Sequence, residues 1–190
     1  QKVFVTEGSE VVPGDPDGSF PVFETDFGVI GVMICFDSLY PEGPAILALR
    51  GAEIIFFPHG IGGIQTSEEY VVTTSRVRAV DNCVYVVPCG FGRRVDRGEG
   101  NFGRSCVIDP SGVILADAGH GPGLASAVVD LETVRVVQGY GGPAVFNDAR
   151  ERLIRERRAD ILQELANVAW DRREEMWFHQ RYGGLSETSA

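Results

Sequence analysis

Cys35 is the residue of this sequence whose type and position best suit covalent chemistry. It ends an almost continuous apolar run, 29–35, which is typical of a strand buried on both faces, and a polar stretch, Asp37-Ser38, follows it. A side chain in that place is expected at the carboxyl edge of a sheet, where α/β folds bind ligands. A thiolate there would be a nucleophile. The alternative is a buried thiol that only packs, and position alone does not decide between the two.

The surrounding motifs favour the nucleophile. They are 31–37 (GVMICFD), 40–42 (YPE), 49–55 (LRGAEII), 76–87 (RVRAVDNCVYVV), 102–112 (FGRSCVIDPSG) and 129–131 (VDL), with a double arginine at 157–158. In this order they resemble the motifs of the nitrilase superfamily of carbon–nitrogen hydrolases, amidase and carbamoylase branch. Each motif alone would be weak, but the whole series covers most of the chain and is specific.

The resemblance implies a catalytic set of Glu, Lys and Cys, usually with a second Glu. Lys2 lies upstream of Cys35 at the offset of the family's lysine, and it is the only lysine in the chain, although a terminal surface residue is the other interpretation. Glu10 stands at the offset of the second Glu, with Glu7 as its competitor. The first Glu, the general base, would precede Gln1. The sequence is therefore expected to be a fragment that lacks the N-terminal part of its domain, and a damaged homologue is the weaker alternative.

Three further residues are expected near the oxyanion or the substrate. The backbone N–H of Phe36, just after the nucleophile, is expected to stabilise the oxyanion together with Lys2. Asp37 is expected to make structural hydrogen bonds beside the nucleophile. His59 follows a predicted strand, so it is expected at the same sheet edge and in the pocket, although a loop histidine is more often a surface residue.

The remaining cysteines are interpreted as reduced, buried structural thiols: Cys83, Cys89 and Cys106. No CxxC pair is present and the spacings fit no zinc framework, so neither a metal site nor a dithiol redox pair is predicted. Arg78 and Asn82 match family positions that we interpret as scaffold.

The predicted function is hydrolysis of a linear amide or an N-carbamoyl amine through a Cys35 thioester, which releases ammonia or an amine. No metal or organic cofactor is expected. A nitrilase that converts a nitrile to an acid is the alternative within the same chemistry, and Asp37 favours the amidase branch slightly because nitrilases often carry Glu there. A non-catalytic homologue that acts as an interaction module is the alternative from another class, but the presence of Cys35, Lys2 and Glu10 argues against it.

The elements expected around these residues are those of an α/β (α+β) fold. Turn signals and apolar periodicity predict strands at 22–25, 29–35, 53–58, 83–88 and 124–130, a hairpin at 105–108 and 113–116, and helices at 41–52, 66–81 and 149–177. The resemblance implies the four-layer α-β-β-α sandwich of the nitrilase type, of which this chain would form the C-terminal part. The expected domains are 1–165, the hydrolase domain, and 166–190, a C-terminal extension that forms an interface or a tail.

The composition of the chain indicates which kinds of partner it can bind. The net charge of −10 makes nucleic acid or an anionic membrane a poor partner, so a small-molecule substrate is expected. No apolar run reaches the length of a membrane span, and the first residues show no signal-peptide pattern, although an upstream segment could carry a targeting signal. The four cysteines, interpreted as reduced thiols, favour a cytoplasmic protein. Trp170, Trp177 and other aromatic residues near the C-terminus favour a homo-oligomer, because such side chains are enriched at interfaces.

Overall fold

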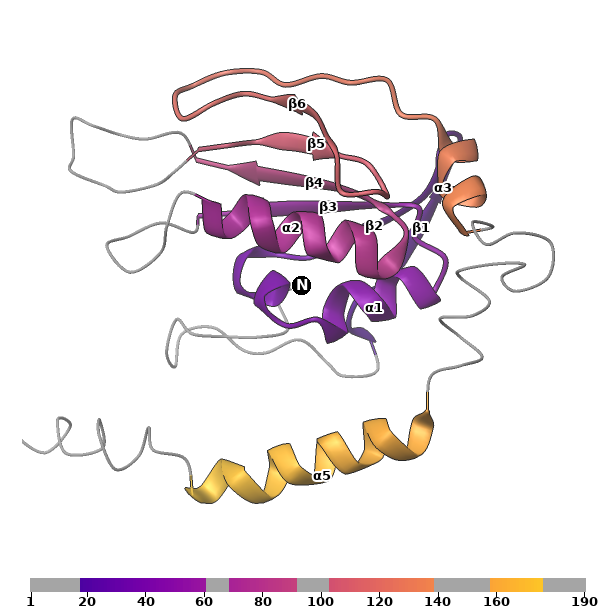
Figure 1. Cartoon of the computed structure of the whole chain (residues 1–190), viewed down its shortest axis with the longest axis vertical. Helices are drawn as coiled ribbons and strands as arrows, with labels where there is room; N and C mark the ends of the chain where they lie inside the picture. Colours follow the sequence, from indigo (N-terminus) through magenta and orange to yellow (C-terminus); the bar gives the residue numbers. More distant parts are fainter. Residues whose placement is uncertain (1–17, 61–68, 92–102, 139–157, 176–190) are drawn as a thin grey trace, which may run out of the picture. The chain divides into compact units, whose positions relative to one another are not determined.

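The centre of the molecule is a six-stranded mixed sheet. In the computed structural model, which describes residues 18–60, 69–91, 103–138 and 158–175, the strands lie side by side in the order in which they occur in the sequence (Figure 1). β2, β3 and β4 are parallel, and the other neighbours are antiparallel. The strands are β1 (Val22–Thr25), β2 (Gly28–Val32), β3 (Ile54–His59), β4 (Tyr85–Gly90), β5 (Cys106–Ile108) and β6 (Ile114–Asp117).

Two helices cover one face of this sheet. Helix α1 (Glu42–Leu49) connects β2 to β3, and helix α2 (Glu69–Asn82) lies between β3 and β4, so each parallel pair is a βαβ unit (Figure 1). The core lies between sheet and helices, where Leu47 and Val71 meet the strand residues Ile55, Phe57 and Val86. Gly31 permits the close approach of α1, because a Cβ atom there would lie 2.9 Å from Leu47 Cδ2.

The opposite face of the sheet is partly open. The start of helix α3 (Leu131–Gln138) covers part of it, where Val134 packs against Ile54 of β3 and Tyr85 of β4. Elsewhere on the strands, Phe23 is 49% exposed and Phe56 is 36% exposed. The sheet thus has helices α1 and α2 on one face, and the exposed apolar part of its other face is what a second sheet would cover in the expected sandwich.

The predicted strand 124–130 is wrong. This segment forms no strand, because it pairs with neither edge strand of the sheet, β1 or β6. Leu124 is 89% exposed and Val128 is 91% exposed, so their apolar character did not indicate burial. Helix α3, which follows it directly, was not predicted.

The other elements lie near their predicted places. Strands 22–25, 53–58 and 83–88 and the hairpin are found with ends shifted by a few residues, and helix 41–52 is shorter. The strand 29–35 ends at Val32, because the chain turns sharply before Cys35. Helix 66–81 is seen from Glu69, and its first predicted residues lie outside the described ones.

A second compact unit follows the first. The units are 1–154 and 155–190, and the described part of the second is helix α5 (Ala159–Glu175), which lies within the predicted helix 149–177. The boundary predicted after residue 165 stays a prediction. Among the described residues, no helix is both long and apolar enough to cross a membrane.

Candidate active site

Cys35 lies in a sharp turn at the carboxyl end of β2. Met33 still donates its backbone N–H to Phe56 O over 3.1 Å, which extends the pairing of β2 with β3. Cys35 then has a φ of 53° and begins a short 3₁₀ helix, η3 (Cys35–Leu39). A positive φ is rare for residues other than glycine, and strained positions of this kind cluster at functional sites. The turn places Cys35 at the sheet edge that its sequence position predicted.

The turn is held by its own residues. Asp37 is fully buried, and its Oδ2 accepts the backbone N–H of Ile34 over 3.1 Å, while its own backbone N–H donates to Ile34 O over 3.1 Å. The Ser38 hydroxyl donates to Cys35 O over 3.1 Å. These bonds join the residue before Cys35 to the residues after it, so they fix the backbone on both sides of the thiol.

The structural role expected for Asp37 agrees with these contacts, since its carboxylate binds the backbone beside the nucleophile. Phe36 is half-buried, and its ring meets the Tyr40 ring edge-on with centroids 5.7 Å apart. The assignment of the Phe36 N–H and of Asp37 to oxyanion or substrate binding stays a prediction.

His59 ends β3, the parallel neighbour of β2, at the same edge of the sheet. It is buried, and its ring stacks on Phe57 with centroids 4.9 Å apart. Burial lowers the pKa of His59 to about 4, so the imidazole is neutral at pH 7. Gly90 packs so closely that a Cβ atom there would lie 2.6 Å from His59 Cε1. His59 is therefore a packed residue of the edge, and its contact with substrate stays a prediction.

Lys2, Glu10 and Glu7 lie outside the described residues. Of the predicted catalytic set, the structure thus places Cys35 alone. Within the described residues, no three His, Cys, Asp or Glu side chains are grouped so that they could hold a metal ion.

The family model described as carbon–nitrogen hydrolase matches residues 4–138. The chain belongs to this family. The motifs around Cys35 thus lie within a carbon–nitrogen hydrolase domain, and the family match extends through the sheet to α3.

The relatives of this carbon–nitrogen hydrolase include amidases. The human deaminated glutathione amidase is 36% identical over 129 residues, which are 68% of this chain and 38% of that protein. The Nit3 structure from Saccharomyces cerevisiae has 31% identity and a TM-score of 0.67, covering 76% of this chain and 52% of that one. A variant of the amidase from Nesterenkonia sp. AN1, in which acrylamide has added to the active site cysteine, has 26% identity and a TM-score of 0.60, covering 70% and 52%. The chain spans less than half the length of the curated relatives it matches.

The other cysteines of the hydrolase domain differ from one another. Cys83 and Cys106 are buried as expected, and burial raises the pKa of the Cys106 thiol to about 12, which keeps it protonated. Cys89 is exposed, which corrects the expectation that it is buried. The reason is strand alternation, because Val86 of β4 points into the helix-covered core whereas Cys89 lies on the other face.

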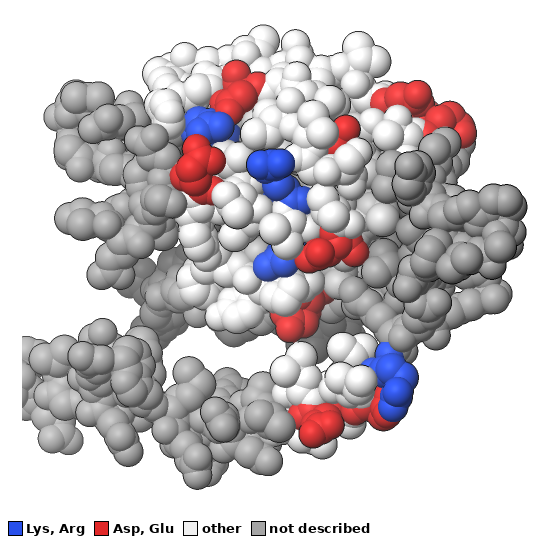
Figure 2. Space-filling model, in the orientation of Figure 1, with Lys and Arg blue, Asp and Glu red and all other residues white. Residues whose placement is uncertain are grey.

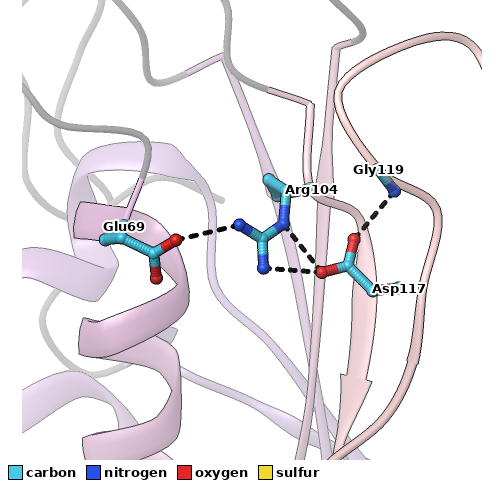
Figure 3. A network of polar contacts seen from close by, with 4 residues as sticks. All are labelled: Glu69, Arg104, Asp117 and Gly119. Carbon is cyan, nitrogen blue, oxygen red and sulfur yellow. Dashed lines mark hydrogen bonds and ion pairs between the residues drawn. The ribbon is translucent and has the colours of Figure 1, made fainter.

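Sequence reasoning also missed a polar network at the same sheet edge (Figure 3). Arg104 Nη2 lies 2.7 Å from Asp117 Oδ2 and Arg104 Nη1 lies 3.0 Å from Glu69 Oε1, so the end of β6 is tied to the start of α2. The other Asp117 oxygen accepts the Gly119 N–H over 2.8 Å. The hydrogen bond to Asp117 is the main reason that the pKa of Arg104 is raised. No local sequence pattern predicts these contacts, because Glu69, Arg104 and Asp117 are far apart in the chain.

Proposed function

We propose that this chain carries the nucleophile of an amidase, and that Cys35 attacks the carbonyl carbon of a linear amide. The observation that carries the proposal is the conformation of Cys35, held at φ 53° at the carboxyl edge of a parallel sheet, in a chain of the carbon–nitrogen hydrolase family. The names of the relatives, deaminated glutathione amidase and omega-amidase, support an amide substrate.

The proposed reaction has two halves. The general-base Glu, expected upstream of Gln1, takes the Cys35 proton, and the thiolate attacks the carbonyl carbon. Lys2 and the Phe36 N–H stabilise the oxyanion, and Glu10 orients Lys2 or the substrate. The C–N bond breaks, the nitrogen takes the proton from the Glu, and ammonia or an amine leaves. Water then hydrolyses the thioester, which releases the acid and restores the thiol.

The substrate is proposed to be a small molecule. The net charge of −10 disfavours a polyanionic partner. On the face of the molecule that Figure 2 shows, most of the described residues are uncharged, and in several places basic side chains lie next to acidic ones. Arg78 pairs with Asp81 and Arg104 pairs with Glu69, so each of these basic side chains is partly neutralised by an acidic neighbour. We further place the protein in the cytoplasm, where its four free cysteines would stay reduced.

The protein is also proposed to be a homo-oligomer. Two apolar side chains on the outer surface of α2, Val77 and Val80, are 43% and 50% exposed. On the described part of α5, Ile161 and Leu165 are each 55% exposed. Apolar helix surfaces of this kind are typical of subunit contacts.

The activity is tested on the protein expressed with the segment upstream of Gln1. Purified protein is incubated with matched linear amides, N-carbamoyl amines and nitriles, and ammonia release is measured. Hydrolysis of an amide is expected, and it should be lost in Cys35→Ala but kept in Cys89→Ala. Iodoacetamide should label Cys35 faster than Cys89, although both are accessible to some degree. Full activity of Cys35→Ala would refute the proposal, and turnover of nitriles alone would reassign the substrate.

A further inference from the structure

Arg78 connects helix α2 to the turn that begins at Cys35. Its side chain is only 12% exposed, and its guanidinium donates to two backbone carbonyls, Ser38 O from Nε and Leu39 O from Nη2, each over 3.5 Å. Ser38 and Leu39 are the last residues of η3. The final carbonyls of a helix have no partner inside it, so a cation in this place satisfies them.

The neighbouring motif residues orient Arg78. Asp81 Oδ2 lies 3.6 Å from Arg78 Nη1, one helical turn away on the same helix. Asn82 Nδ2 donates to the backbone oxygen of Arg78 over 2.9 Å. The polar side chains of the segment 78–82 are therefore directed either at the Cys35 turn or at Arg78 itself.

This contact differs from the other bonds of the turn. Asp37 and Ser38 belong to η3, so their bonds fix its internal shape. Arg78 comes from a separate helix, which is packed on the sheet through Val71 and Ala79. Its contacts therefore fix where the turn lies relative to the rest of the domain.

We propose that Arg78 is a positioning residue for Cys35. By binding the Ser38 and Leu39 carbonyls, it fixes the position of the turn at the edge of the sheet. The Cys35 thiol is thereby kept in the orientation for attack. Arg78 acts through the backbone of the turn and touches no substrate. This inference rests on the proposed function, because it takes Cys35 as the nucleophile.

The test compares Arg78→Gln with the unchanged protein, both expressed with the upstream segment. We expect kcat for the amide to fall about 10- to 100-fold, since a misplacement of about 1 Å costs a factor of this order. KM should stay within about threefold, because no group that binds substrate is removed. The ratio of Cys35 to Cys89 alkylation by iodoacetamide should fall as well, with Cys89 as the internal reference.

Arg76→Gln is the matched control. Arg76 lies on the same helix, and its Nε donates to Gly112 O over 2.7 Å, in the turn between β5 and β6 and away from Cys35. It loses a contact of the same kind, so thermal unfolding should respond in both variants whereas kcat should fall only in Arg78→Gln. Arg78→Lys should give an intermediate kcat, because an ammonium keeps the charge but lacks the planar fork that reaches two carbonyls.

A kcat within twofold of normal in folded Arg78→Gln would overturn the inference. So would an equal loss of kcat in Arg76→Gln at the same fall in Tm, because the effect would then be one of general stability. If Arg78→Gln does not fold, the alkylation ratio in Arg78→Lys decides, with a lowered ratio supporting the inference and an unchanged ratio overturning it. Activity retained in Cys35→Ala would instead refute the proposed function, which is a separate outcome.

Discussion

At the scale of single residues, Cys35 is costly to hold in place. For a residue with a Cβ atom, the left-handed backbone conformation costs about 1–2 kcal/mol of free energy. The folded domain must therefore stabilise this conformation of Cys35 through other contacts. Asp37 and Ser38 supply them from within the turn. Strain of this kind is useful because it presents the thiol at the edge of the sheet instead of burying it along a strand.

Lys2 is predicted to act electrostatically on the oxyanion. Lys2→Arg keeps the positive charge but replaces a compact ammonium by a larger planar group that stays protonated. We expect kcat to fall about 10²- to 10³-fold, the scale for loss of one oxyanion donor. Steady-state kinetics of the protein with its upstream segment measure this, and a near-normal kcat would make Lys2 a surface residue.

His59 is predicted to make stability depend on pH. Its pKa is about 4 in the folded protein and 6.5 in the unfolded chain, because burial disfavours the charged ring. The unfolded chain therefore binds more protons between these values. The stability linked to the neutral ring is fully present above pH 6.5, declines as the pH falls below 6.5, and is lost by about pH 4.

Urea unfolding at several pH values measures this effect. In His59→Gln the free energy of unfolding should vary less between pH 6.5 and pH 4 than in the unchanged protein. Ser75→Ala is the control, because it changes another buried polar residue but removes no group that titrates in this range. A profile that is the same in all three proteins would contradict the prediction.

At the scale of elements, the motif at 49–55 marks the end of helix α1. Arg50 caps the end of α1, and its guanidinium also donates to the backbone oxygens of Ser19 and Phe20. Gly51 has a φ of 112°, which lets the chain leave the helix and enter β3. The R-G-A segment thus ends one element, starts the next and binds the incoming chain.

The Arg104 network is predicted to stabilise the join between α2 and β6. Arg104→Gln should lower the free energy of unfolding by about 1–2 kcal/mol, because its hydrogen bonds to the Asp117 carboxylate are charge-assisted and its side chain is only 16% exposed. Glu69→Gln is the matched control, with an expected loss of about 0.5 kcal/mol or less, since the Glu69 side chain is 66% exposed. Denaturant melts compare the two, and equal losses would contradict the assignment.

At the scale of the whole molecule, the open sheet face is the main feature to account for. Phe23 and Phe56 are exposed on it, and the chain covers 52% of the yeast Nit3 chain that it matches. A sheet in a sandwich is covered on both faces, so the apolar residues of this face are suited to a second sheet.

The homo-oligomer is tested by truncation. Deleting residues 167–190, which include Trp170, Trp177 and other aromatic residues, should shift the assembly to smaller species in light scattering, because these side chains are proposed to lie at a subunit contact. Deleting only 183–190 is the control and should leave the assembly unchanged. If the full-length protein is a monomer at micromolar concentration, the prediction is wrong.

The sequence by itself determined the family, the nucleophile candidate and most of the elements. Local patterns carry this information, because a buried strand, a helix cap and a turn each depend on residues that are close in the chain. The strands 22–25 and 53–58 and the hairpin were predicted in this way. The strand 124–130 failed because a strand needs a partner edge, which no local pattern reports.

Only the tertiary structure decided what holds Cys35 in place. The contact of Arg78 with Ser38 and Leu39 and the neutral state of His59 both depend on elements that are distant in the sequence. Burial and long-range hydrogen bonds arise only when these elements pack, so a motif can mark a residue as important without showing what it contacts. The exposure of Cys89 on one face of β4 and the burial of Cys106 in the core were decided in the same way, by the side of the sheet on which each lies.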